Sequence, residues 1–344
     1  MLKICITFVL MKLLRLILFP IVPIYFGITW LRNKLYDAGI KSSKSYNFPV
    51  ICVGNLSTGG TGKTPMIEYL VSLLTPEYKV ATLSRGYKRV TKGFLLADTN
   101  ANVDTIGDEP FQFYKKFETI YVAVDENRQN GISELLKLIP KPEVILLDDA
   151  YQHRKVKAGF NILLSSYHHL YTKDMVLPTG NLREPKSGAK RADVIIVTKC
   201  PTEISEAEKT RIIYQINPRA YQNVFFSSIK YADTIQSMRN ERKLDELQKF
   251  SLVTGIANAK PLVDFLKSRG LDFEHLEFGD HYNYTTKDIE VFEGKELLVT
   301  TEKDFMRLLG YETLASKLFY LPIKIELDKP EKFDTIIKDY MINQ

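Results

Sequence analysis

A glycine-rich loop at residues 53–65, "VGNLSTGGTGKTP", places the strongest constraint on the fold of this chain. Gly59, Gly60 and Gly62 can adopt positive φ angles, which lets several backbone N–H groups turn toward one point. The apolar run "PVICVG" precedes the loop, and the amphipathic stretch "TPMIEYLVSLL" follows it. This order of strand, loop and helix predicts a P-loop nucleotide-binding fold.

The end of the loop supplies the groups that contact phosphate. Lys63 is expected to reach the β- and γ-phosphates, and the Thr64 hydroxyl is expected to bind Mg²⁺. The usual pattern G-x-x-x-x-G-K-[ST] has glycine where this chain has Ser57, a change that costs little if that position does not need positive φ. A plain strand–helix turn needs one glycine, not three followed by Lys-Thr. We therefore expect the phosphates to be held by Gly59, Gly60, Thr61, Gly62, Lys63 and Thr64.

An acidic pair provides a partner for the metal. The stretch "EVILLDDAYQHR" runs from apolar residues into Asp148 and Asp149. Carboxylates at the carboxyl end of a parallel strand fall where ligands bind, so one of them is expected to hold Mg²⁺ directly or through water. Without the P-loop, a solvated strand end would be the better interpretation of the pair.

Apolar runs alternate with helical patterns from residue 49 onward, which predicts an α/β fold with a parallel, doubly wound sheet. More of these runs follow residue 160 than one nucleotide domain needs. We therefore expect a P-loop domain over residues 46–157 and a second α/β domain over residues 158–344. The runs are "KVATLSR", "TIYVAVD", "EVILLDD", "NILLSS", "ADVIIVTK", "VFFSSI", "FSLVTGIA", "ELLVTTEK" and "LFYLPIKIEL".

The N-terminal stretch "LILFPIVPIYFGITWL", residues 16–31, carries no charge and has basic residues on both sides. As one helix it would measure about 24 Å, short of a hydrocarbon core of about 30 Å. Pro20 and Pro23 are expected to kink it. We expect residues 1–45 to form a short membrane-embedded or interfacial anchor with a basic flank. The alternatives are a core helix or a cleaved signal peptide, although no small-x-small cleavage site is present.

Charge and cysteine content exclude several classes of protein. The net charge is +6, without the runs of Lys and Arg interleaved with aromatic residues that nucleic-acid binders carry. A mild positive excess suits an anionic membrane surface or a phosphorylated substrate. The three cysteines form no CxxC pair, which indicates a reducing compartment and argues against a zinc site.

The class of P-loop protein is narrowed by two absences in the sequence. A GTPase needs N/T-K-x-D to bind guanine, and after Thr198 and Lys199 this chain has Pro201 where the aspartate should be. A dimerising ATPase places a second lysine where this chain has Thr58. A hydrolase or a kinase remains.

Seven further motifs, together with the P-loop and "LDDAYQHR", resemble the tetraacyldisaccharide 4'-kinase family, the lipid A 4'-kinases of Gram-negative bacteria. The resemblance covers residues of about 20 to about 310, with matching order and spacing. It implies two α/β domains around a cleft, the second closing it, and an N-terminal membrane helix. The motifs are "SRGYKR" (84–89), "GDEP" (107–110), "DENRQNG" (125–131), "LPTGNLREP" (177–185), "TGIANAKP" (254–261), "FGDHYNY" (278–284) and "TTEKD" (300–304).

The chain departs from the family pattern at a few positions. Ala150 and Tyr151 stand in place of Gly-Phe after the acidic pair, and Ala259 interrupts the usual "GIANP". The motif "FGDHYNY" has Gly279 and Tyr282 where a proline and a second histidine are usual. This puts any role of a second histidine in doubt.

The resemblance implies transfer of the γ-phosphate of MgATP to the 4'-hydroxyl of a tetraacylated glucosamine disaccharide 1-phosphate. Asp108 matches the family's catalytic aspartate and His281 the histidine that supports it, while Lys63 acts on the phosphates. Glu109 is a candidate for metal contact. Taken without these motifs, Asp108 would be a turn or helix-cap residue and His281 a packed loop histidine.

Cations are needed to offset the charge on the transferred group and to hold the 1-phosphate of the acceptor. Arg85, Arg128 and Arg183 lie in motif loops and are the candidates, although each is as well suited to a structural ion pair. Gln152 and His153, next to the acidic pair, are expected to contact the acceptor or the γ-phosphate.

The acceptor is an amphiphilic glycolipid, so the anchor would hold the enzyme at the cytoplasmic face of the bacterial inner membrane, where ATP is. The expected cofactors are ATP and Mg²⁺, no nucleic acid is expected as a partner, and a monomer is expected. The alternative function is a P-loop nucleotide switch or chaperone that binds a membrane partner without transferring phosphate.

Overall fold

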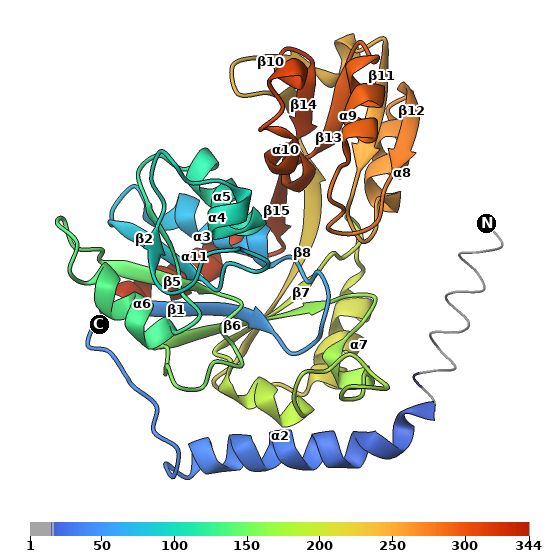
Figure 1. Ribbon diagram of the computed structural model, residues 1–344. Helices are drawn as coiled ribbons and strands as arrows, with labels where there is room; N and C mark the ends of the chain where they lie inside the picture. The colour runs from blue at the N-terminus through green and yellow to red at the C-terminus, as the bar shows by residue number, and fades with distance from the viewer. Residues whose placement is uncertain (1–14, 16, 344) are drawn as a thin grey trace. The chain divides into compact units, whose positions relative to one another are not determined.

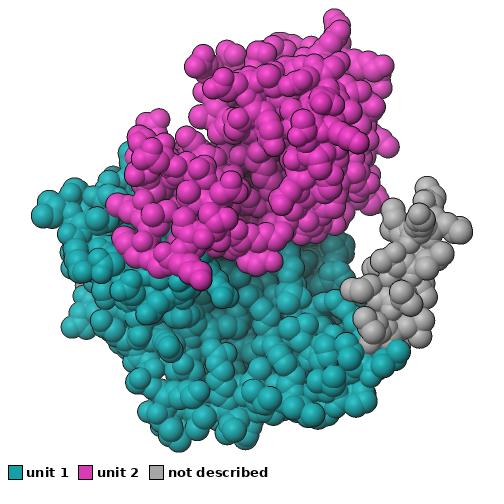
Figure 2. Space-filling model, viewed as in Figure 1, with its two compact units in different colours: residues 1–85, 119–228, 325–344 teal, residues 86–118, 229–324 magenta. Residues whose placement is uncertain are grey.

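A computed structural model describes Arg15 and residues 17–343 of the chain (Figure 1). The chain divides into two compact units, coloured teal and magenta in Figure 2. Unit 1 contains Met1–Arg85, Thr119–Ser228 and Ile325–Gln344, and unit 2 contains Gly86–Glu118 and Ile229–Lys324. This division differs from the expected single boundary near residue 157, because both units are built from separated stretches of the chain.

The sheet of unit 1 confirms the predicted parallel α/β architecture (Figure 1). Its strands pair in parallel from β8 to β4, and β1 is buried along its whole length at the centre. From β15 to β4 the order is β15 (Ile323–Leu327), β8 (Asn223–Tyr231), β7 (Val194–Thr198), β6 (Phe160–Ser166), β1 (Val50–Asn55), β5 (Val144–Asp148), β2 (Val80–Ser84) and β4 (Tyr121–Val124).

Helices complete unit 1 by burying one apolar face each. Helix α3 (Lys63–Leu74) buries Met66, Ile67, Leu70 and Val71 among others, a spacing of three and four residues that forms one stripe. The C-terminal helix α11 (Pro330–Ile342) returns to this unit, where the Tyr340 hydroxyl accepts from Val50 N at 3.2 Å. The other regular elements here are α6 (Arg128–Leu135), α7 (Glu206–Ile216), η2 (Tyr171–Lys173) and η3 (Lys186–Arg191).

The N-terminal segment forms η1 (Phe19–Ile21) and α2 (Val22–Asp37). Pro20 and Pro23 lie in the first turns of η1 and α2, where a first-turn N–H has no helical acceptor to lose. No helix among the described residues is both long and apolar enough to cross a bilayer. The part of the expected anchor at residues 1–14 and 16 lies outside the described residues.

Unit 2 has a smaller mixed sheet, in agreement with the predicted second α/β unit. Its order is β10 (Glu241–Lys243), β9 (Thr234–Gln236), β14 (Leu318–Leu321), β13 (Leu298–Thr301), β11 (Lys249–Thr254) and β12 (Asp272–Glu277). The four strands from β14 to β12 are parallel, and β9 pairs antiparallel with both of its neighbours. Leu252, Val299 and Phe319 form the centre of its core.

Two short helices from early in the chain belong to unit 2. They are α4 (Val103–Ile106) and α5 (Asp108–Lys116), and α5 packs against α10 (Glu302–Leu308) from the far end of the sequence. This packing brings the "GDEP" and "TTEKD" motifs together. The remaining elements of the unit are β3 (Leu95–Leu96), η4 (Leu244–Glu246), α8 (Lys260–Ser268), α9 (Thr286–Glu293) and η5 (Glu312–Leu314).

Candidate active site

The predicted phosphate loop of unit 1 runs from the end of β1 at Asn55 to the start of α3 at Lys63. Gly59 and Gly62 adopt positive φ angles of 97° and 86°, where a side chain would be strained. Ser57 is not among the residues with positive φ, and it pairs with Leu182 in an isolated β-bridge. An extended backbone at this position explains why the loop tolerates serine in place of glycine.

Asp149 contacts two cations, one of them the lysine of the phosphate loop. It follows β5 directly with a positive φ of 48°, and its carboxylate lies 3.7 Å from Lys63 Nζ and 2.7 Å from Arg183 Nη2. Burial raises the pKa of Asp149, but the opposing effect of Lys63 and Arg183 is larger and holds that pKa below its ordinary value. The result is an ionised carboxylate beside the lysine that is expected to meet phosphate.

Oxygen ligands suitable for Mg²⁺ gather at the same end of the sheet. Asp148 ends β5, Asp149 follows it, and Thr64 lies in the first turn of α3. Hard carboxylate and hydroxyl oxygens are the ligands that Mg²⁺ prefers, with the remaining positions taken by water and nucleotide phosphate. No group of three or more His, Cys, Asp or Glu side chains suited to a metal occurs among the described residues. The donor set therefore fits a metal that is shared with a bound nucleotide.

Buried polar atoms near these strand ends lack a protein partner. Within the described chain, Asn55 Nδ2, Ser84 Oγ and Arg128 Nε are shielded from solvent and make no hydrogen bond. Buried polar groups are almost always paired, so unpaired ones at strand ends indicate where a ligand would bind. Asn55 ends β1 and Ser84 ends β2, which places both at the carboxyl edge of the parallel sheet.

The predicted substrate-binding cations are found in unit 1, in different settings. Arg128 is only 3% exposed, and its Nη1 donates to Asp125 O at 2.8 Å, while Arg85 is exposed. Burial and the neighbouring Arg128 lower the pKa of His153 to about 4, so this ring is neutral at physiological pH. Gln152 donates to Asn55 O and to Glu184 Oε1, at 2.8 and 3.0 Å, which gives its amide a structural role.

Helix α2 is tied to the segment that carries Arg183. Tyr25 Oη donates to Arg183 O at 2.9 Å, and Asn33 Nδ2 donates to the buried Glu184 at 2.6 Å. Arg32 donates to Gln152 O at 2.6 Å. Sequence reasoning missed Glu184, although it lies inside the motif "LPTGNLREP", because a buried glutamate bridging three partners cannot be inferred from its neighbours in sequence.

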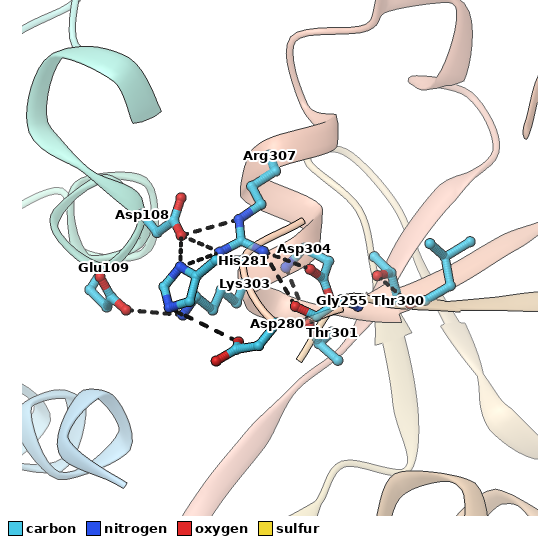
Figure 3. Close-up of polar contacts among 11 residues, drawn as sticks. Asp108, Glu109, Gly255, Asp280, His281, Thr300, Thr301, Lys303, Asp304 and Arg307 are labelled. Atoms are coloured by element: carbon cyan, nitrogen blue, oxygen red, sulfur yellow. Dashed lines mark hydrogen bonds and ion pairs between the residues drawn. The ribbon is translucent and has the colours of Figure 1, made fainter. Parts of the chain in front are cut away.

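The second group of predicted residues lies in unit 2 (Figure 3). Asp108 begins α5 after Gly107, whose positive φ of 92° turns the chain into the helix. His281 lies in the loop after β12, and its Nδ1 is 3.2 Å from Asp108 Oδ2. The structure thus brings together the two residues that the motifs "GDEP" and "FGDHYNY" had singled out.

Helix α10 adds two cations to this pair. Arg307 donates to Asp108 Oδ2 through Nε at 3.1 Å and through Nη2, and Lys303 Nζ lies 3.0 Å from His281 Nε2. Lys303 also pairs with Glu109 at 3.2 Å. Burial raises the pKa of Asp108, but Arg307, Lys303 and His281 lower it below its ordinary value.

The sequence analysis did not identify Arg307, although a helix continued past the motif "TTEKD" would have placed it near the residues of that motif. The motif "TTEKD" ends at Asp304, and Arg307 lies three residues later, on the same face of α10 as Asp304 and Lys303. The Asp304 carboxylate, which has no exposed surface, accepts from Arg307 Nη1 at 3.1 Å and from Gly255 N at 2.8 Å. The motif "TGIANAKP" therefore supports the same cluster.

The sequence of this chain is similar to those of known proteins along nearly its whole length. The family model described as tetraacyldisaccharide-1-P 4'-kinase, LpxK, matches residues 14–342. The tetraacyldisaccharide 4'-kinase of Flavobacterium johnsoniae is 50% identical over 337 residues, which cover 96% of this chain and 98% of that protein. The enzyme of the same name from Phocaeicola vulgatus is 43% identical and covers 94% of each chain.

A solved structure agrees with these sequence relationships. The crystal structure of LpxK from Aquifex aeolicus in complex with ATP matches with a TM-score of 0.77 and 33% sequence identity. The match covers 95% of this chain and 99% of that one. Fold and sequence similarity therefore extend over nearly the whole length of both chains.

Proposed function

This chain belongs to the tetraacyldisaccharide-1-P 4'-kinase family, and from that membership we propose how its own residues carry the reaction. The protein is an ATP-dependent kinase of lipid A biosynthesis that phosphorylates the 4'-hydroxyl of a tetraacyldisaccharide 1-phosphate. The observation that favours phosphoryl transfer over a nucleotide switch is the Asp108–His281 contact of 3.2 Å. A switch that only binds and releases nucleotide has no need of a carboxylate–imidazole pair to receive a proton.

Unit 1 holds the phosphate donor in this proposal. The N–H groups of residues 59–64 bind the phosphates at the start of α3, where the helix dipole favours an anion. Lys63 contacts the β- and γ-phosphates, and Arg183, Arg128 and Arg85 supply further positive charge to the phosphates of donor and acceptor. Thr64, Asp148 and Asp149 would hold Mg²⁺, which, when bound, neutralises charge on the β- and γ-phosphate oxygens.

Unit 2 supplies the proton acceptor. Asp108 takes the proton of the 4'-hydroxyl as that oxygen bonds to phosphorus, and His281 orients the carboxylate through Nδ1. Glu109 is ion-paired with Lys303 at 3.2 Å, and its contact with the metal stays a prediction. The expected monomeric state also stays a prediction.

We propose that α2 lies on the membrane at the cytoplasmic face of the inner membrane. Its polarity is inverted: Thr29 and Asn33 are its buried residues, whereas Ile24 and Ile28 are 62% and 63% exposed. Ile24, Ile28 and Leu31 follow a spacing of four and three residues, which forms one apolar stripe away from the protein. An exposed apolar stripe on a soluble surface is unfavourable, and a lipid surface would cover it.

Replacing Ile24 and Ile28 together by glutamine is expected to lower the vesicle-bound fraction roughly tenfold or more, because two apolar side chains no longer enter the lipid. Cosedimentation with vesicles of phosphatidylethanolamine and phosphatidylglycerol measures it. Ile139→Gln is the matched control, since Ile139 is fully exposed on a turn after α6. Unchanged binding of the double variant would remove α2 as the membrane contact.

The function itself is tested by its product. Full-length protein is incubated with γ-labelled ATP, Mg²⁺ and a detergent-dispersed tetraacyldisaccharide 1-phosphate. Label is expected in the glycolipid, and chelation of the metal with EDTA is expected to abolish transfer until Mg²⁺ is restored. Free phosphate as the only labelled product, with or without lipid, would contradict a kinase and favour the nucleotide switch.

A further inference from the structure

Arg307 is the one side chain that contacts both members of the Asp108–His281 pair from α10 (Figure 3). Its guanidinium directs Nε and Nη2 at Asp108 Oδ2, while Nη2 lies 2.9 Å from His281 Nδ1. The side chain is 8% exposed, so water does not replace these contacts. A buried arginine that directs two nitrogens at one carboxylate oxygen fixes the position of that oxygen.

The opposite side of the guanidinium is fixed as well. Nη1 donates to Asp304 Oδ1 at 3.1 Å and to Gly255 O at 3.4 Å. Asp304 is itself held, because its Oδ2 accepts from Gly255 N at 2.8 Å and from Thr301 Oγ1 at 2.7 Å. Arg307 therefore has little freedom to leave Asp108.

These contacts divide the Asp108 carboxylate into two different oxygens. Oδ2 receives Arg307 and faces His281 Nδ1, whereas Oδ1 makes no hydrogen bond within the described part of the chain. His281 Nδ1 lies beside both Arg307 Nη2 and Oδ2, and His281 Nε2 faces Lys303 Nζ, so the ring occupies the Oδ2 side of the carboxylate. Oδ1 is left as the oxygen that can receive a proton.

We propose that Arg307 is a positioning residue of the transfer reaction: it fixes the Asp108 carboxylate through Oδ2 and leaves Oδ1 to accept the proton of the acceptor hydroxyl. This inference rests on the proposed role of Asp108 as the base. The same contact keeps the carboxylate ionised at low pH, since Arg307 acts against the burial that would raise the pKa of Asp108.

Several charged groups near Asp108 affect the pKa of its carboxyl group. Arg307 and Lys303 come from α10, and His281 comes from the loop after β12. Glu109, next on α5, is partly offset by its ion pair with Lys303, and Asp304 by its pair with Arg307. Arg307 is the largest of the contributions that lower the pKa of Asp108, so its removal is expected to have the largest effect.

The test is the pH profile of kcat/KM for full-length Arg307→Gln with MgATP and the tetraacyldisaccharide 1-phosphate. The acidic limb is expected to move upward by about one to three pH units, because an adjacent opposite charge lowers a carboxyl pKa by that amount. At neutral pH, kcat is expected to fall roughly 10- to 100-fold through misplacement of the base. KM for ATP is expected to stay within about twofold, since the phosphate loop is in unit 1.

Two further variants separate positioning from stability. Arg307→Lys keeps the charge but not both nitrogens that reach Oδ2, so its acidic limb is expected near that of the wild type with a lowered kcat. Arg269→Gln is the matched control: Arg269 also joins two carboxylates of unit 2, Asp233 and Asp245 at 2.8 and 2.7 Å, but on the surface. Its pH profile is expected to equal that of the wild type. Thermal unfolding of all three proteins reports whether they fold.

The results that would refute the role of Arg307 differ from those that would refute the role of Asp108 as the base. Wild-type kcat in a folded Arg307→Gln variant would refute the positioning role if Asp108→Asn is inactive. If Arg307→Gln does not fold, wild-type kcat in Arg307→Lys would refute it instead. Full turnover by Asp108→Asn would refute the base, and with it the inference.

Discussion

Asp108→Asn is expected to lower kcat by about 100- to 10,000-fold, the range that a positioned general base contributes. The amide keeps the shape of the side chain but accepts no proton at the working pH. KM for ATP should change less than about twofold, because the residues expected to bind the nucleotide belong to unit 1 and Asp108 to unit 2. Steady-state transfer of label from γ-labelled ATP to the glycolipid measures both quantities.

A neighbouring carboxylate provides the control for this variant. Asp104 on α4 lies in the same unit, is exposed, and takes part in no ion pair with the cluster of Figure 3. Asp104→Asn is expected to turn over as the wild type does. If Asp108→Asn kept normal turnover in the same assay, another group would have to accept the proton.

Lys63→Met is expected to lower kcat/KM for ATP by about 100- to 1,000-fold. This is the range that follows when an enzyme loses one positioned donor to the charge that develops in the transition state. Methionine keeps the apolar stem of lysine in contact with the loop while removing the ammonium. Asp149 keeps its contact with Arg183 at 2.7 Å, so the variant does not leave that carboxylate without a cation. Initial rates over a range of ATP concentrations, together with calorimetric titration of ATP, give the effect on binding and on turnover.

Lys137→Met is the control for charge loss in the same unit. Lys137 is exposed, and its ion pair among the described residues is with Glu134 on α6, at 2.7 Å. Its kinetics should match those of the wild type. Wild-type kcat/KM in Lys63→Met would show that the ammonium does not act on the transferred phosphate.

Local patterns made much of unit 1 predictable. The loop "VGNLSTGGTGKTP", the strand before it and the helix after it depend on neighbours in sequence, and the structure places all three as expected. The acidic pair was predictable beside the P-loop, since an apolar run ending in Asp148 indicates a strand that stops at the edge where a parallel sheet binds its ligand. Ser57 needed the structure, because its bridge to Leu182 depends on a distant segment.

Asp108 and His281 were predictable only through their motifs, because the chemistry of an isolated aspartate or histidine leaves both structural and catalytic roles open. The contact between them joins positions that are 173 residues apart in sequence. The division into units was not predicted for a related reason. Helix α5 packs on α10, so residues 86–118 belong to unit 2, although the chain on both sides of them belongs to unit 1. Periodicity reports which face of an element is apolar, not which distant element covers it.

The amino-acid sequence alone indicates a nucleotide-binding α/β chain and the kinase family to which its motifs point, and it predicts which oxygens would bind Mg²⁺. These follow from residues close together in the chain, where backbone conformation and spacing suffice. Tertiary structure alone decides that Arg307, 199 residues from Asp108, sets the direction of its carboxylate, and that α2 presents isoleucines outward and Asn33 inward. Such contacts depend on the packing of the whole unit, because a side chain's charge and exposure are set by the neighbours that folding brings to it.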